Sequence, residues 1–186
     1  ASSYAKISGQ MLPPYDSAAT LQQLRDLADG CGAQRIICLG DNFHDDDGER
    51  RLQGAAADML RDLTRQYDWH WIVGNHDPGI GSSWGGRVYQ EMEIRGIMLR
   101  HNIVASDMRP EISGHYHPKL RIKLRGRRVS RRCFLQTPSR LVMPAFGAFT
   151  GGMDVGQICP LLPDCDEATA WVPVRDRFVQ FDLAAA

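Results

Sequence analysis

The stretch IICLGDNFHD, Ile36 to Asp45, passes directly from four apolar residues into a dense polar cluster. An apolar, β-branched run that ends at glycine is typical of a buried strand. Carboxylates at the end of a buried strand are costly in free energy unless cations neutralise them. The stretch therefore predicts a strand over 34–39 that ends at a cation-binding site.

Helix-like and strand-like segments alternate through the first half of the chain. We expect helices over 16–28 and 49–67, and strands over 34–39, 69–73, 97–99 and 111–113. A hairpin with Gly126 near its turn is expected over 120–135, and a closing strand over 177–181 in an otherwise irregular last third. This order predicts an α/β sandwich flanked by helices, in one domain spanning 1–186.

The composition is that of an ordinary globular protein. Lysine and arginine together number 22, as do aspartate and glutamate, so the formal net charge is zero. We expect no membrane span, because no run approaches about eighteen consecutive apolar residues, and no secretory signal. The five cysteines are odd in number and lack a CxxC spacing, which favours reduced thiols and a cytoplasmic location.

Four successive predicted strands end near a residue that metal ions favour as a ligand: Asp41, Asn75, His101 and His115. In open α/β sheets, ligands bind beyond the carboxyl ends of the strands. Glycine precedes Asp41, Asn75 and His115, and glycine lets the backbone turn sharply and approach a bound group closely. We therefore expect these side chains to surround one centre.

Each of these strand endings also has an ordinary explanation when taken alone. Gly-Asp after a strand is usually a turn, and Asn-His-Asp is usually a polar loop. Two histidines separated by one residue, such as His115 and His117, can also be an ordinary pair at a strand end whose hydrogen bonds are made within the protein. The combination favours a metal centre, because five of the six histidines lie in or beside such endings. The sixth, His70, lies in a tryptophan-rich strand and is expected in the core or on the surface.

The ligand types indicate which metals this centre would hold. Carboxylate, amide and imidazole groups together suit Mn²⁺, Fe or Zn²⁺ rather than Ca²⁺. A carboxylate can bridge two such ions about 3.5–4 Å apart, and the pair lowers the pKa of a shared water and holds the entering and leaving oxygens of an in-line displacement at phosphorus. The residues therefore predict a dinuclear centre for phosphoester hydrolysis.

The motifs GDNFHD, GNHD, the isolated histidine after GIML, and GHYH occur in the order found in calcineurin-like metallophosphoesterases, which the chain resembles. The longer matches SSYAKISGQMLPPYD, IVGNHDP, ISGHYHP, RRCF and LVMPAFGAFTGGMDV resemble the bacterial DNA ligase-associated metallophosphoesterases. This resemblance runs from the first residues to about Val155. It implies a metallophosphoesterase-type β-sandwich flanked by helices and a centre with two divalent ions, Mn²⁺ before Fe or Zn²⁺.

The resemblance also implies a role for each metal ligand. Asp41 would bridge both metals. Asn75, His101 and His115 would complete the second metal, and His117 would ligate the first.

Two further histidines are implied to be catalytic. His76, beside Asn75 but not a ligand, would protonate the leaving oxygen, a task suited to a group that titrates near neutrality. The phosphatases of the family have Asp three residues after the bridging Asp, where this chain has His44. That variant resembles the DNA-repair nuclease branch, in which this histidine supports the histidine of GNHD, so we expect a His44–His76 pair.

One family motif does not occur in the sequence. The family opens with Asp-x-His on its first strand, which supplies two more ligands to the first metal and lies just upstream of the segment that resembles Ser2-Ser3-Tyr4. We therefore expect that strand to lie upstream of Ala1. Without it, the first metal would be held only by Asp41 and His117.

A basic stretch follows the GHYH motif. Eight lysines and arginines lie between Lys119 and Arg132, with no acidic residue among them. Alternation with apolar residues would put Arg121, Lys123 and Arg125 on one face of a strand, where they could neutralise phosphates without reading a base sequence. The other reading of the stretch is a solvated hairpin face. The residues that we expect to bind nucleic acid are Arg121, Lys123, Arg125, Arg127 and Arg128.

The sequence as a whole predicts a metal-dependent phosphodiesterase associated with DNA repair. Family analogy adds DNA ligase and helicase as partners. One alternative is a non-catalytic DNA-binding or scaffold module of a ligase–helicase assembly. Another is a phosphomonoesterase or nucleotide pyrophosphatase of the same superfamily, because these reactions can share one metal core.

Overall fold

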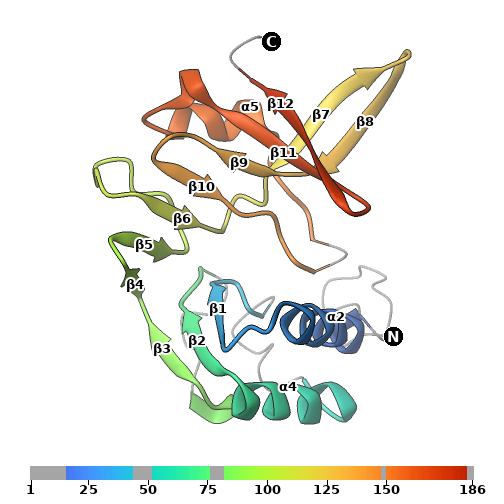
Figure 1. Ribbon diagram of the computed structural model, residues 1–186, viewed down its shortest axis with the longest axis vertical. Helices are drawn as coiled ribbons and strands as arrows, with labels where there is room; N and C mark the ends of the chain where they lie inside the picture. The colour runs from blue at the N-terminus through green and yellow to red at the C-terminus, as the bar shows by residue number, and fades with distance from the viewer. Residues whose placement is uncertain (1–15, 44–51, 76–81, 148–149, 184–186) are drawn as a thin grey trace. The chain divides into compact units, whose positions relative to one another are not determined.

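The computed structural model describes residues 16–43, 52–75, 82–147 and 150–183. They form two compact units (Figure 1). The first runs to Gln90 and includes Phe146 and Gly147, and the second comprises Glu91–Ala145 and the residues from Thr150 onward. The predicted α/β class is confirmed, since sheets and helices occur together. No helix in the described ranges is long and apolar enough to cross a membrane.

The first unit is a parallel sheet with two helices. Its elements are α2 (Asp16–Cys31), β1 (Arg35–Leu39), α4 (Ala55–Gln66), β2 (Asp68–Ile72), η1 (Ser82–Trp84) and β3 (Arg87–Tyr89). The sheet order is β1-β2-β3, and both strand pairs are parallel. The core joins the helices to the sheet, and its buried members include Ala28, Leu60, Leu63, Trp69 and Trp71.

The second unit contains a seven-stranded sheet and a separate hairpin. Its strands are β4 (Glu91–Ile94), β5 (Ile97–Arg100), β6 (Glu111–Ser113), β7 (Lys119–Leu124), β8 (Arg127–Arg132), β9 (Phe134–Gln136), β10 (Arg140–Val142), β11 (Thr169–Val174) and β12 (Arg177–Asp182). The large sheet has the order β12-β11-β9-β10-β6-β5-β4, and β7 pairs with β8 alone. Helical turns are α5 (Val155–Ile158), η2 (Cys159–Leu161) and η3 (Cys165–Glu167). They help to cover a core that contains Leu120, Leu135, Val142, Ile158 and Val172.

Two sequence expectations about the elements are wrong. The helix expected over 49–67 begins only at Ala55, because Gly54 has φ 61° and ψ −146°, outside the helical region. Leu52 nevertheless packs against the core of the first unit. The last third is not irregular, since α5 and two short 3₁₀ helices precede β11, which pairs with both β9 and β12.

The expectation of five reduced thiols is also wrong. Cys159 and Cys165 form a disulfide, because the two 3₁₀ helices bring their Cα atoms to 5.2 Å, within the usual range for such bonds. Cys31, Cys38 and Cys133 are free. Burial raises the pKa of the Cys133 thiol to about 12, so this cysteine packs as a small apolar residue rather than acting as a nucleophile.

Asp68, at the start of β2, lies close to three basic side chains. Its carboxylate lies 2.8 Å from Nε of Arg35, 3.0 Å from Nε2 of His70 and 3.3 Å from Nη1 of Arg87. The imidazole of His70, followed by the guanidinium of Arg35, holds the pKa of Asp68 down at about 2, against an ordinary value of 3.8. His70 is itself buried and stacks on Tyr89, so it is a core residue.

We expect Asp68→Asn to lower the free energy of unfolding at neutral pH. A carboxylate whose pKa is depressed in the folded state stabilises the fold above its ordinary pKa and loses that effect as pH falls toward the folded-state pKa. The difference between wild type and variant in urea unfolding should therefore shrink as pH falls below 3.8 toward about 2. Asp62→Asn is the control, because its carboxylate is exposed and lies 4.0 Å from Arg65. A penalty that stays constant between neutral pH and about pH 3 would contradict this assignment.

Candidate functional site

The parallel strands β5 and β6 position His101 and His115. Arg100 pairs with Ser113 at the carboxyl ends of the two strands. The ladder continues one step further, since the N–H of Gly114 donates to the carbonyl of His101 at 3.0 Å. His101 and the Gly114-His115 pair are therefore held side by side, although they lie far apart in the sequence.

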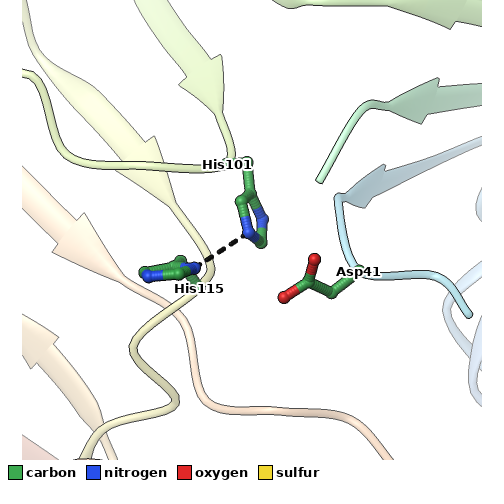
Figure 2. Close-up of side chains that lie close together, drawn as sticks. All are labelled: Asp41, His101 and His115. Carbon is green, nitrogen blue, oxygen red and sulfur yellow. Dashed lines mark hydrogen bonds between the residues drawn. The ribbon is translucent and has the colours of Figure 1, made fainter. Parts of the chain in front are cut away.

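The rings of His101 and His115 lie next to each other in an edge-to-face arrangement (Figure 2). Nδ1 of His115 lies 3.0 Å from Nε2 of His101, and the ring planes are at 79°. His101 is 4% exposed, and His115 packs its other side against the ring of Tyr116. Two nitrogens that each lie about 2.1 Å from one ion, at roughly a right angle, would be about 3 Å apart. The two imidazoles share a hydrogen bond in this structure, and the same spacing suits two ligands of one divalent cation.

A buried ionic network fixes the strands that carry these histidines. Arg100 is 4% exposed, and its guanidinium lies 2.8 Å from Asp107 and 3.4 Å from the fully buried side chain of Glu111. Arg109, followed by Arg100, holds the pKa of Asp107 well below its usual range. Glu111 also accepts from the backbone N–H of Val104. The network ties the end of β5 and its following loop to the start of β6.

The parallel strands β1 and β2 position Asp41 and Asn75, the predicted ligands in the first unit. Leu39 pairs with Ile72, and Nδ2 of Asn42 donates to the carbonyl of Ile72 at 3.3 Å. A Cβ placed on Gly74 would overlap the backbone nitrogen and the carboxylate of Asp41. The glycine before Asn75 is therefore required for the close approach of the two strand ends. Asp41 is half-buried, and Asn75 is exposed.

Three of the predicted ligands have left-handed backbone: Asp41 at φ 50°, His115 at φ 59° and His117 at φ 49°. Such a conformation costs a residue with a side chain roughly 1–2 kcal/mol. In the described ranges, the remaining non-glycine residues with positive φ are three arginines between paired strands, where a turn accounts for it: Arg95, Arg125 and Arg175. Conformational strain outside such turns often marks a functional site.

The structure thus places the predicted site residues in two groups. His101 and His115 are together, with His117 following in the same loop, and Asp41 lies beside the Gly74-Asn75 turn. His44 and His76 lie outside the described residues, so their catalytic roles stay predictions, as do the ligand roles. The sequence did not predict the ionic network around Arg100 and Glu111, because its charged residues are spread along the chain and form no motif.

The predicted nucleic-acid residues lie on the β7–β8 hairpin, with one correction. Arg121 and Lys123 are on β7, and Arg127 and Arg128 are on β8. Arg125 does not share the strand face, since Arg125 and Gly126 form the turn with φ 47° and 79°. Positive φ at both central residues is typical of the two-residue hairpin turn.

The donor set fits a divalent cation. Asp41 in the first unit, and His101 and His115 in the second, each carry a ligand atom of the kind that Mn²⁺, Fe and Zn²⁺ accept. Cysteine, which soft metals prefer, does not belong to this group.

No protein-family model matches the chain, and no curated protein sequence is significantly similar to it. Among solved structures, its fold is similar to that of the Pseudomonas putida nuclease MPE, with a TM-score of 0.72. The two chains are 24% identical, and the match covers 92% of this chain and 82% of the other. A likeness at this identity concerns the fold, and it agrees with the predicted metallophosphoesterase-type sandwich. Membership of the calcineurin-like family stays a prediction.

We expect Gly74→Ala to destabilise the first unit and to weaken metal binding. The added methyl group would meet the backbone of Asp41, which cannot move aside as a flexible side chain would. Overpacking of this kind costs about 1–3 kcal/mol. The measurements are thermal unfolding and titration with Mn²⁺.

Gly30→Ala is the matched control. Gly30 lies in α2, and nothing lies within 4 Å of an added Cβ. Replacing a helical glycine with alanine is expected to be neutral or stabilising by about 0.5–1 kcal/mol. Equal effects of the two substitutions would show that the contact between Gly74 and Asp41 is unimportant.

Proposed function

We propose that this protein is a metal-dependent phosphodiesterase that hydrolyses nucleic-acid phosphodiester bonds at a dinuclear centre. Asp41, Asn75, His101, His115 and His117 would hold two divalent ions, with Mn²⁺ as the preferred metal. The observation that carries the proposal is the His101–His115 pair, whose ring nitrogens lie 3.0 Å apart at the joint carboxyl ends of two parallel strands.

The local geometry of the other ligands supports the same proposal. Asp41 has left-handed backbone, and its backbone nitrogen and carboxylate approach Gly74 closely at the end of the neighbouring strand. A partly buried carboxylate is stabilised by neutralisation of its charge. A cation shared with the imidazole pair would supply it.

The chemistry of hydrolysis follows from these groups. Two bound ions would lower the pKa of a shared water and stabilise the negative charge that develops on the phosphoryl oxygens. Asp41, as the carboxylate with two oxygens, is suited to bridge them. His76 is proposed to give a proton to the leaving oxygen, and His44 to orient His76.

A nucleic-acid substrate is supported by the structural neighbour and by the basic hairpin. The Pseudomonas putida protein with this fold is a nuclease. The hairpin carries exposed cations on both strands, which suits a polyanion better than a small phosphate ester. A role in DNA repair, with ligase and helicase as partners, stays a prediction from family resemblance.

The basic hairpin also favours one competing function, a DNA-binding module without catalysis. Binding of that kind would survive removal of the metal, whereas hydrolysis would not. A phosphomonoesterase is distinguished by its preference for p-nitrophenyl phosphate over bis-p-nitrophenyl phosphate.

We expect the full-length protein to hydrolyse bis-p-nitrophenyl phosphate with Mn²⁺ and to lose this activity on chelation. Asn75→Ala should abolish most of the activity, because it removes a proposed ligand. Gln90→Ala, which removes an exposed side-chain amide at the end of the first unit, is the control and should keep full activity. Wild-type turnover by Asn75→Ala, or turnover that survives chelation, would refute the proposal.

We expect His76→Ala to retain metal binding but to hydrolyse a diester with a weakly acidic leaving group, such as diphenyl phosphate, more slowly by a factor on the order of 10²–10⁴, the size of a general-acid contribution. A substrate with a more acidic leaving group should be affected less, because it needs no proton to depart. Calorimetric titration with Mn²⁺ and rates for two aryl diesters provide the test. Equal losses with both diesters would remove His76 from the role of general acid.

A further inference from the structure

The β7–β8 hairpin has one face that carries Arg121, Lys123 and Arg128, and an opposite face whose β7 residues pack against the core. Arg121 pairs with Ser130, and Lys123 pairs with Arg128, so these side chains share one face. Leu120 and Ile122 alternate with them and pack against the core of the second unit. The cations are therefore directed away from that core.

The same alternation continues from the hairpin into the large sheet. Cys133 and Leu135 are fully buried in the core that contains Leu120, so Arg132 and Phe134 point to the opposite side. Phe134 pairs with Trp171 on β11, and its ring contacts that of Phe178 at a centroid distance of 5.7 Å. The cationic face therefore runs into a group of three aromatic rings.

The aromatic group is accessible to a ligand. Phe178 is 57% exposed, and Phe134 and Trp171 are half-buried. Exposed aromatic rings next to a charged surface are more informative than single exposed aliphatic side chains. The rings offer flat faces on which another planar group could stack.

The hairpin also carries charge repulsion that an anion would relieve. Lys123 and Arg128 stand opposite each other, and neither has an acidic partner in the described part of the chain. Like charges directly opposite on paired strands are destabilising. Arg121 is the member of this face that reaches an acid, with Nε 3.7 Å from Asp154.

We propose that the hairpin face formed by Arg121, Lys123 and Arg128, together with Phe134, Trp171 and Phe178, is one binding surface for single-stranded nucleic acid. The cations neutralise phosphates without reading sequence. The rings stack on bases, which a single strand exposes and a duplex keeps inside. As a statement about the substrate this rests on the proposed function, but the surface is defined without the metal centre.

The cationic half is tested by fluorescence anisotropy with fluorescein-labelled oligo(dT) and the full-length protein in EDTA, which prevents metal-dependent cleavage. For Lys123→Gln/Arg128→Gln, the plot of log K against log salt concentration should become less steep, with the magnitude of its negative slope smaller by about 1.4. Each phosphate contact on a single strand contributes about 0.7 to that magnitude. The melting temperature should not fall, since the substitution removes a like-charge pair.

The matched control is Arg65→Gln/Arg95→Gln, which removes two exposed charges from α4 and from the turn after β4. Its salt slope should equal that of the wild type. An unchanged slope in the Lys123/Arg128 variant would overturn the assignment of these cations.

The aromatic half is tested by substitutions at Phe178. Phe178→Ala should weaken binding on the order of 10- to 100-fold with no change in the salt slope, the signature of lost stacking. Phe178→Tyr should bind as the wild type does, whereas Phe178→Leu should behave like the alanine variant. Equal affinity of all three variants would overturn the stacking role.

Competition with unlabelled duplex DNA tests the preference for a single strand. Duplex should compete more weakly than oligo(dT) of the same length, and equal competition would overturn that preference. Failure here is distinguishable from failure of the proposed function. A protein that binds oligo(dT) in EDTA but never hydrolyses bis-p-nitrophenyl phosphate would keep this surface and lose the catalytic proposal.

Discussion

The candidate site depends on parallel strand pairing. Strands that run in the same direction deliver their carboxyl ends to one edge of a sheet, so residues that follow them become neighbours whatever their separation in sequence. The β5–β6 ladder extends to the hydrogen bond between Gly114 and His101 and so brings two imidazoles together. The β1–β2 ladder does the same for Asp41 and Gly74. An antiparallel pair would have sent these ends to opposite edges.

This arrangement has a conformational cost, and the surrounding structure sustains it. Asp41, His115 and His117 adopt left-handed backbone where no hairpin turn requires it. Glycine at position 74 removes the overlap that any side chain would create. In the second unit, Arg100 and Glu111 bind the two strands by a buried ion pair, which would leave an uncompensated charge if either member were removed. In each unit, the strained backbone of the proposed ligands therefore occurs beside a feature that holds the neighbouring strand ends in place.

The sequence predicted what periodicity and strand endings encode. The strands before Asp41, Asn75, His101 and His115 lie where apolar runs placed them, because buried strands leave a strong local signal. The start of α4 was predicted too early, because the backbone dihedral angles of Gly54 lie outside the helical region. Strand β11 was missed because Pro173 interrupts the residue pattern of a strand. The group of Phe134, Trp171 and Phe178 could not be predicted, because strand register, rather than sequence proximity, brings it together.

The zero net charge conceals two kinds of arginine that burial separates. Arg140 is 2% exposed and donates to the backbone carbonyls of Asp107, Arg109 and Ser139. Its guanidinium therefore provides hydrogen-bond donors to carbonyl groups of the loop after β5. Arg128, on the hairpin, is exposed and faces another cation. A buried arginine of the first kind is expected to be needed for folding, because its loss would leave buried carbonyl groups unpaired. A cation of the second kind contributes little to folding, and the polyanionic ligand proposed above would relieve its repulsion by Lys123 if it contacted both side chains.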